Sequence, residues 1–164
     1  MISAKVMLLG DIGVGKSSLA RRFVFDRFDS EYKTTIGVDV LTHDVDLGAA
    51  ANHEKLRFVL WDTDGDFGAR IFETVYLLGA SAAIVVGDAT RPATLVKMAA
   101  LVAQFDERLP GRPVVAIVNK VDLSPQPDNG AGAPHEILYT SAKTGQGVAE
   151  MFLALGHAIL RRSR

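Results

Sequence analysis

The residues with the clearest chemical role form a short glycine-rich segment near the N-terminus. Residues 10–17 read GDIGVGKS and fit the pattern G-x-x-x-x-G-K-[ST]. Glycines let a backbone wrap closely around a phosphate, and the N–H groups at the start of a helix supply positive potential. In such a loop Lys16 would contact the β- and γ-phosphates, and the Ser17 hydroxyl would ligate Mg²⁺. The alternative is an ordinary glycine-rich turn before a helix, but the apolar run before it and the helical pattern after it favour the phosphate loop.

Three further polar segments follow in order, each at the end of an apolar run. Residues 62–65 read DTDG, which suits a carboxylate near Mg²⁺ and a glycine N–H near the γ-phosphate. Residues 119–122 read NKVD. The Asp122 carboxylate can accept two N–H bonds from guanine, whereas adenine lacks that paired donor edge, and Asn119 would bond the base or brace the loop. Residues 141–143 read SAK and would close over the base.

Strand-like and helix-like stretches alternate along the chain, which predicts an α/β domain. The sheet should be mostly parallel and six-stranded, with helices on both faces. Its strands are expected at residues 4–9, 38–47, 56–61, 82–86, 114–118 and 137–139. The helices are expected at residues 16–25, 94–109 and 148–160. In a parallel sheet, ligands bind beyond the carboxyl ends of the strands, which is where the polar segments fall.

Composition narrows the class of protein. The 164 residues are 48% hydrophobic and 23% charged, as expected for a single domain over residues 1–164. A net charge of −1 does not indicate the basic surface that nucleic-acid-binding proteins carry. No apolar run is long enough to cross a bilayer. The chain has no cysteine, which excludes disulfides, a thiol nucleophile, and prenyl or palmitoyl anchors. We therefore expect a monomeric, cytoplasmic protein without a lipid anchor.

Taken in order, these segments resemble the motifs of Ras-superfamily small GTPases over nearly the whole chain. They are most similar to the Rab branch: residues 10–18 read GDIGVGKSS, 32–39 YKTTIGVD, 60–63 LWDT and 140–145 TSAKTG. The resemblance implies a Ras-like G domain of the P-loop NTPase class that binds GTP or GDP with Mg²⁺. It also implies protein effectors and exchange or activating proteins that meet two switch segments, residues 29–37 and 64–76.

The resemblance further implies roles for individual residues. Thr35 matches the switch I threonine that ligates Mg²⁺, Phe28 the aromatic residue that packs on guanine, and Gly65 the glycine that senses the γ-phosphate. The implied nucleotide-binding residues are Gly13, Val14, Gly15, Lys16, Ser17, Ser18, Phe28, Thr35, Asn119, Lys120, Asp122, Ser141, Ala142 and Lys143. The implied metal ligands are Ser17, Thr35 and Asp62, and the implied catalytic residues are Lys16, Thr35, Gly65 and Asp66.

Three positions beside the expected γ-phosphate depart from the family pattern. Asp66 stands where the family places the glutamine that orients the attacking water, and the phosphate would repel its carboxylate. Asp64 replaces a small residue and adds a carboxylate near Asp62. Ile12 brings a branched side chain to a position where a small residue is common. These changes predict slow GTP hydrolysis, unless a rearranged switch II or an internal arginine such as Arg70 compensates.

Other functional interpretations stay open at this level. A pseudo-GTPase scaffold with permanently bound nucleotide would fit the same departures, whereas NKVD disfavours a P-loop ATPase. Trp61 and Tyr76 lie where Rab-like proteins expose an aromatic effector patch, although a lone aromatic is more often partly buried packing. Residues 48–53 are expected to form an exposed connection. Residues 124–136 are short and rich in Pro and Gly, so the fourth helix of the fold should be missing or shortened.

Overall fold

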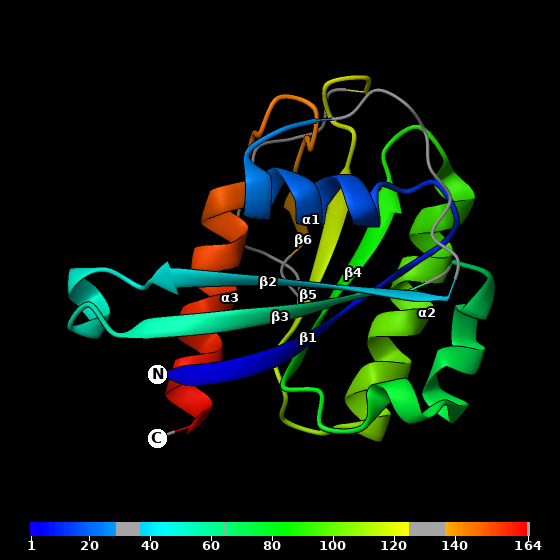
Figure 1. Cartoon of the computed structure of the whole chain (residues 1–164). Coiled ribbons are helices and arrows are strands. Elements are labelled where there is room, and N and C mark those ends of the chain that lie inside the picture. The colour runs from blue at the N-terminus through cyan, green and yellow to red at the C-terminus, as the bar shows by residue number, and fades with distance from the viewer. Residues whose placement is uncertain (29–36, 64, 125–136, 164) are drawn as a thin grey trace.

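A six-stranded sheet forms the centre of the molecule. The computed structural model describes residues 1–28, 37–63, 65–124 and 137–163 (Figure 1). The strands run in the order β2-β3-β1-β4-β5-β6, and only β2 is antiparallel to its neighbour. Their bounds are β1 Ile2–Gly10, β2 Val38–Asp46, β3 Lys55–Thr63, β4 Ala82–Asp88, β5 Val114–Asn119 and β6 Ile137–Tyr139. The predicted α/β class and the mostly parallel sheet are confirmed.

Burial along the strands explains their sequences. Every residue of β4 is buried, because this strand lies in the middle of the sheet with helices on both faces. The edge strand β2 instead alternates exposed and half-buried residues, as its mixed polar sequence predicts. Together β2 and β3 form an antiparallel hairpin that places Val40 opposite Trp61.

Three α-helices in the described part of the chain cover the sheet, at bounds close to those predicted. Helices α1 (Lys16–Phe25) and α3 (Val148–Ser163) pack on one face, and α2 (Pro92–Arg108) packs on the other (Figure 1). Phe23 of α1 stacks on Phe152 of α3 at 3.7 Å between ring centroids, and both meet Phe58 edge-on. Of two short 3₁₀ segments, η2 (Gly65–Glu73) lies beside α2, and η3 (Val75–Leu77) lies beside η2.

Two sequence-based expectations concern segments that connect the strands. The connection between β2 and β3 is not simply exposed: it contains a 3₁₀ turn, η1 (Ala49–Ala51), and it buries Leu47 and Ala51 in the core. The turn is possible because Gly48 and Asn52 adopt positive φ angles of 82° and 54°. The expected loss of the fourth helix falls on residues 125–136, which lie outside the described residues. No helix in the described ranges is both long and apolar enough to cross a bilayer.

Candidate functional site

The carboxyl ends of the parallel strands bring the predicted polar segments together. The phosphate loop follows β1, Asp62 lies at the end of β3, Asn119 ends β5, and Ser141 follows β6. Lys16, only 6% exposed, is buried together with these three polar residues. Polar groups are rarely buried without partners, so the contacts of this cluster show how the site is built.

The phosphate loop has the backbone conformation that its glycines allow. Gly13 and Gly15 have φ angles of 76° and 105°, which other residues seldom adopt. A Cβ on Gly15 would lie 2.3 Å from the Asn119 amide nitrogen, so no larger residue fits there. Gly15 is also the N-cap of α1, and no side chain caps the helix. A helix start of this kind presents backbone N–H groups to an anion.

Lys16 and Ser17 lie at the inner side of this loop. The Lys16 ammonium donates hydrogen bonds to the carbonyls of Gly10 and Asp11 at 3.0 and 2.9 Å. The Ser17 hydroxyl makes a close hydrogen bond to the Asp62 carboxylate. A hydroxyl beside a carboxylate is an oxygen-only donor pair that fits Mg²⁺. The third expected ligand, Thr35, lies outside the described residues.

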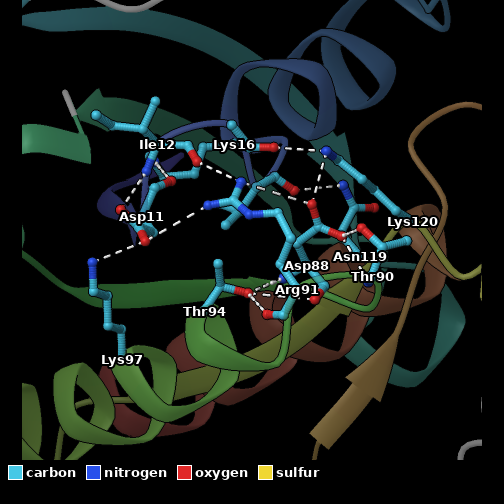
Figure 2. Close-up of polar contacts among 12 residues, drawn as sticks. Asp11, Ile12, Lys16, Asp88, Thr90, Arg91, Thr94, Lys97, Asn119 and Lys120 are labelled. Carbon is cyan, nitrogen blue, oxygen red and sulfur yellow. Dashed lines mark hydrogen bonds and ion pairs between the residues drawn. The ribbon is translucent and has the colours of Figure 1, made fainter.

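The outer side of the phosphate loop is held by a set of residues that we call the outer clamp: Asp88, Arg91, Lys97 and Lys120 (Figure 2). The Lys97 ammonium lies 2.9 Å from the Asp11 carboxylate. The Arg91 guanidinium donates to the Ile12 carbonyl at 2.8 Å, and the Lys120 ammonium donates to the Gly13 carbonyl at 2.7 Å. Asp11, Ile12 and Gly13 are therefore each held by at least one cation, and Arg91 also lies 3.7 Å from the Asp11 carboxylate.

Asp88 is the anionic member of the outer clamp and holds Lys120 in place. Its fully buried carboxylate lies 2.9 Å from the Lys120 ammonium and accepts two hydrogen bonds from Thr90. Burial disfavours the charged form, but the bonds from Thr90 and Lys120 outweigh burial and lower the pKa of Asp88. Burial likewise opposes ionisation of Asp11, and hydrogen bonds from Lys97 and the Ile12 N–H outweigh it, so the pKa of Asp11 is also lowered.

Sequence reasoning assigned only Lys120 of the outer clamp to the site. Arg91 and Lys97 lie near the start of α2, about 80 positions after the loop that they contact, and no spacing rule connects them to it. Asp88 could have been suspected, because it is a carboxylate at the end of a strand of apolar residues and glycine.

The base-binding loops are organised around Asn119. Its amide donates to the Val14 carbonyl at 3.1 Å, and its carbonyl accepts bonds from the Thr140 hydroxyl and the Ala142 N–H at 3.1 and 3.2 Å. Asn119 thus braces the loops, which is one of the two roles that the sequence left open. The Ser141 hydroxyl donates to the Asp122 carboxylate at 2.7 Å and sets the position of that carboxylate.

The remaining predicted residues lie around this centre. Phe28 is 38% exposed in the segment after α1. A Cβ on Gly65 would lie 2.5 Å from the Ile12 nitrogen, so switch II approaches the phosphate loop closely at this glycine. Asp64 and the side chain of Asp66 lie outside what the structure describes.

The aromatic pair near the switches is partly packed. The ring centroids of Trp61 and Tyr76 lie 6.2 Å apart, and Tyr76 also meets Phe67 edge-on. The Lys5 ammonium covers the Trp61 ring at 3.8 Å from its centroid. Both interpretations of this pair, packing and partner contact, are compatible with half-buried rings.

Comparisons with known proteins agree with this architecture. Residues 5–122 match the sequence profile of the Roc family, described as the Ras of Complex, Roc, domain of DAPkinase. The chain is 34% identical to the GTP-binding protein ypt5 of Schizosaccharomyces pombe, over 94% of this chain and 76% of that protein. It is 36% identical to the Ras-related protein Rab-22A of Homo sapiens, over 94% of this chain and 82% of that protein. The chain therefore belongs to the Ras-like small GTPases, with Rab proteins among its relatives.

Proposed function

We propose that this protein is a Mg²⁺-dependent switch that binds GTP and GDP, hydrolyses GTP slowly and recruits partner proteins through its switch segments. The observation that carries the proposal is the 3.1 Å hydrogen bond from the Asn119 amide to the Val14 carbonyl. It joins a phosphate loop to a loop whose Asp122 suits the paired N–H groups of guanine. Relatives named as GTP-binding and Ras-related proteins support the same assignment.

Different residues of the site would bind the phosphates, the metal ion and the base. Lys16 and the backbone N–H groups at the start of α1 would bind the phosphates and stabilise charge that develops during transfer. Ser17 and Asp62 would hold Mg²⁺, with Thr35 as the third ligand implied by the family resemblance. When bound, the metal would add positive charge beside the β- and γ-phosphates. Asp122 would read the base.

Slow hydrolysis is supported by the position of Ile12 between switch II and α2. Its backbone is in close contact with Gly65 on one side, and its carbonyl is bound by Arg91 on the other. The residue is 36% exposed and lies in the phosphate loop. A branched side chain here takes space needed by the attacking water or by an arginine inserted from a partner. Asp66, at the position of the usual glutamine, adds charge repulsion.

Partner recruitment is supported by exposed apolar residues near the aromatic pair. Val40, Val75 and Leu78 are exposed, and Val40 lies opposite Trp61 in the hairpin. Exposed apolar side chains beside an aromatic pair favour a protein contact. We propose that the protein is a monomer and that it binds its partners in the cytoplasm.

The nucleotide assignment is tested by chemical identification. The protein purified with Mg²⁺ should release GDP or GTP on denaturation, as identified by anion-exchange chromatography. In competition binding, GDP should bind at least tenfold more tightly than ADP, which corresponds to about 1.4 kcal/mol. Asp122→Ala should remove most of that preference. Tighter binding of ADP than of GDP by the unmodified protein would refute the guanine assignment.

The rate assignment needs a single-turnover measurement. GTP hydrolysis without partners should be slower than that of a Rab protein measured in parallel. Asp66→Gln should raise the rate by about tenfold or more, because a neutral amide can orient the attacking water without being repelled by the phosphate. A Rab-like rate in the unmodified protein would contradict slow hydrolysis, and no turnover in either form would favour the non-hydrolysing scaffold.

A further inference from the structure

Residues 71–81 run from the end of η2 to the start of β4 and combine a buried side with an exposed apolar side. Phe72 and Leu77 are 6% and 8% exposed and belong to the core cluster that packs against α2. Val75 and Leu78 are each 72% exposed. Because burial of apolar surface stabilises one orientation of this stretch, the same two side chains stay in contact with solvent.

Two arginines bind the main chain of this stretch near its two ends. Arg108, the last residue of α2, donates to the Phe72 carbonyl at 3.1 Å. Arg112, in the loop before β5, donates to the Ala80 carbonyl. Hydrogen bonds from a guanidinium are stronger than those from a neutral donor. Residues 71–81, which we call the anchored segment, are therefore tied to the rest of the domain at both ends.

Lys5 of β1 holds the turn in the middle of the anchored segment. Its ammonium donates to the Leu78 carbonyl at 2.7 Å, and its own carbonyl accepts a hydrogen bond from the Ser81 N–H at 2.7 Å. The same ammonium lies 3.8 Å from the centroid of the Trp61 ring. One residue of β1 therefore positions both the turn and one ring of the aromatic pair.

The three anchors lie far from the phosphate loop. Arg108 lies about three turns, or about 16 Å, along α2 from Lys97, which contacts that loop. Lys5 lies about 16 Å along β1 from Gly10, where the loop begins. Arg112 precedes the amino end of β5, whereas the loop lies at the carboxyl ends of the strands. The anchors are therefore distant from the place where GTP differs from GDP.

The start of η2 has different surroundings. A Cβ on Gly65 would lie 2.5 Å from the Ile12 nitrogen, so this end of η2 is in contact with the phosphate loop. The family resemblance predicts one continuous switch II over residues 64–76. The contacts divide it instead, because Gly65 lies against the phosphate loop whereas the anchored segment is held by β1, α2 and the loop before β5.

We propose that the anchored segment keeps one conformation whether GDP or GTP is bound, so that the apolar surface of Val75, Tyr76 and Leu78 is presented to partners in both nucleotide states. This inference rests on the proposed guanine-nucleotide binding and concerns the regulation of the partner surface. The partner that it fits is a protein with an apolar contact surface that binds both nucleotide forms. A partner that binds one form alone must contact residues nearer to Gly65 and the phosphate loop.

Hydrogen–deuterium exchange of the full chain tests the inference, because the anchored segment contains hydrogen-bonded amides. The Leu78 N–H donates to the Val75 carbonyl at 3.1 Å, and the Ala80 N–H donates to the Leu77 carbonyl at 3.2 Å. Exchange is measured with Mg²⁺ and saturating GDP, and again with a saturating non-hydrolysable GTP analogue. Exchange rates in the anchored segment should agree within about twofold between the two forms. Peptides that cover Gly65 should differ by more than that.

Variants that remove one anchor test whether the contacts hold the segment. Arg108→Ala and Lys5→Met should each speed exchange in the anchored segment by about tenfold, the effect of one lost charged hydrogen bond. Methionine keeps an apolar side chain at position 5, so Lys5→Met removes mainly the ammonium. Arg108→Lys keeps the charge but not the planar guanidinium, so it should speed exchange by about threefold. It also serves if Arg108→Ala does not fold.

Arg22→Ala is the matched control. The Arg22 guanidinium also donates to a main-chain carbonyl, that of Ala142 at 2.8 Å. Arg22 belongs to α1, which packs on the opposite face of the sheet from α2. Its removal should leave exchange in the anchored segment unchanged at saturating nucleotide.

Nucleotide binding is checked in the same experiment, because peptides that cover residues 16–25 should exchange more slowly with either nucleotide than without one. If they do, a severalfold difference in the anchored segment between the two forms overturns the inference alone. No faster exchange in Arg108→Ala and Lys5→Met, or equal exchange at Gly65, also overturns it. If nucleotide protects no peptide, the guanine-nucleotide assignment fails, and the inference fails with it. Equal exchange of the anchored segment in both forms, with faster exchange in the anchor variants only, supports the proposal.

Discussion

The two halves of the candidate site are held in place by different kinds of interaction. Around the phosphate loop, cationic side chains bind main-chain carbonyls and two aspartates. Around the base loops, buried neutral groups carry most of the contacts, with Asn119 at the centre and the Thr140 and Ser141 hydroxyls beside it. The charged groups among these contacts are Arg22 and the Asp122 carboxylate.

This difference matches what each half must recognise. A polyphosphate is recognised by positive charge, which acts over several ångströms and is screened by salt. A base is recognised by the direction of a few donors and acceptors, which only a rigid and dry surface can hold. We therefore expect the phosphate half to control affinity and the base half to control selectivity. The predictions below separate these two quantities, in order of decreasing effect.

The largest effect is expected for Lys16→Met. Loss of a buried ammonium beside the phosphates should weaken GDP binding by at least about a hundredfold, because charged hydrogen bonds to the ligand are lost. The ratio of the GDP to the ADP dissociation constant should stay within about threefold of its original value. Competition binding at constant Mg²⁺ measures both quantities. A large change in the ratio would contradict the assignment of affinity to the phosphate half and selectivity to the base half.

Asn119→Ala should affect both halves, because the amide joins them. The change leaves the Val14 carbonyl and the Ala142 N–H without their buried partner. Unsatisfied groups of this kind cost about 1–3 kcal/mol. The free energy of unfolding should fall by about 2 kcal/mol in urea titrations, and the preference for GDP over ADP should fall by about tenfold. Unchanged stability would show that Asn119 does not join the phosphate half to the base half.

A change in salt concentration should affect the affinity and the selectivity of the site differently, without any mutation. Raising NaCl from about 0.05 to 0.5 M shortens the screening length severalfold, so GDP affinity should fall by about tenfold. The preference for GDP over ADP should change less than twofold, because direction and not long-range charge carries it. The measurement is competition binding at several salt concentrations. Parallel losses of affinity and selectivity would contradict the comparison.

The smallest effect is expected for Lys97→Met in the outer clamp. Lys97 is 62% exposed, so its ion pair with Asp11 should contribute at most about 1 kcal/mol. Since the folded-state pKa of Asp11 is lowered from 3.8, this contribution is present at neutral pH. It is lost as the pH falls below about 4 through the lowered pKa, because protonation of Asp11 removes the pair.

Unfolding in urea at several pH values tests this expectation. The difference in stability between the unmodified protein and Lys97→Met should be measurable at pH 7 and should shrink as the pH falls below 3.8 and Asp11 becomes protonated in the folded state. A matched control is Lys143→Met, which removes another lysine charge but leaves Asp11 untouched. No difference at pH 7, or a difference that does not shrink as Asp11 is protonated, would show that the Lys97–Asp11 pair does not stabilise the fold.

Much of the fold and part of the site could be predicted because the signals are local. Helix α1 has the predicted bounds, since a phosphate-loop glycine precedes it and an apolar stripe with a 3.6-residue period runs through it. The strand ends were found for a similar reason: an apolar run stops at a polar residue, as at Asn119. Buried Ala51 was missed, because a glycine-rich connection has no period to show which residues turn inward.

The sequence by itself determined the order of the motifs, the α/β class and the residue types that meet phosphate, metal and base. Only the tertiary structure decided which side chains hold those motifs in place. Arg22 and Ala142 are separated by 120 positions, and Lys97 and Asp11 by 86. No short pattern links such pairs, because their distance depends on how helices cross the sheet and where strands end. Supporting contacts of this kind arise only when the packed core brings distant elements together.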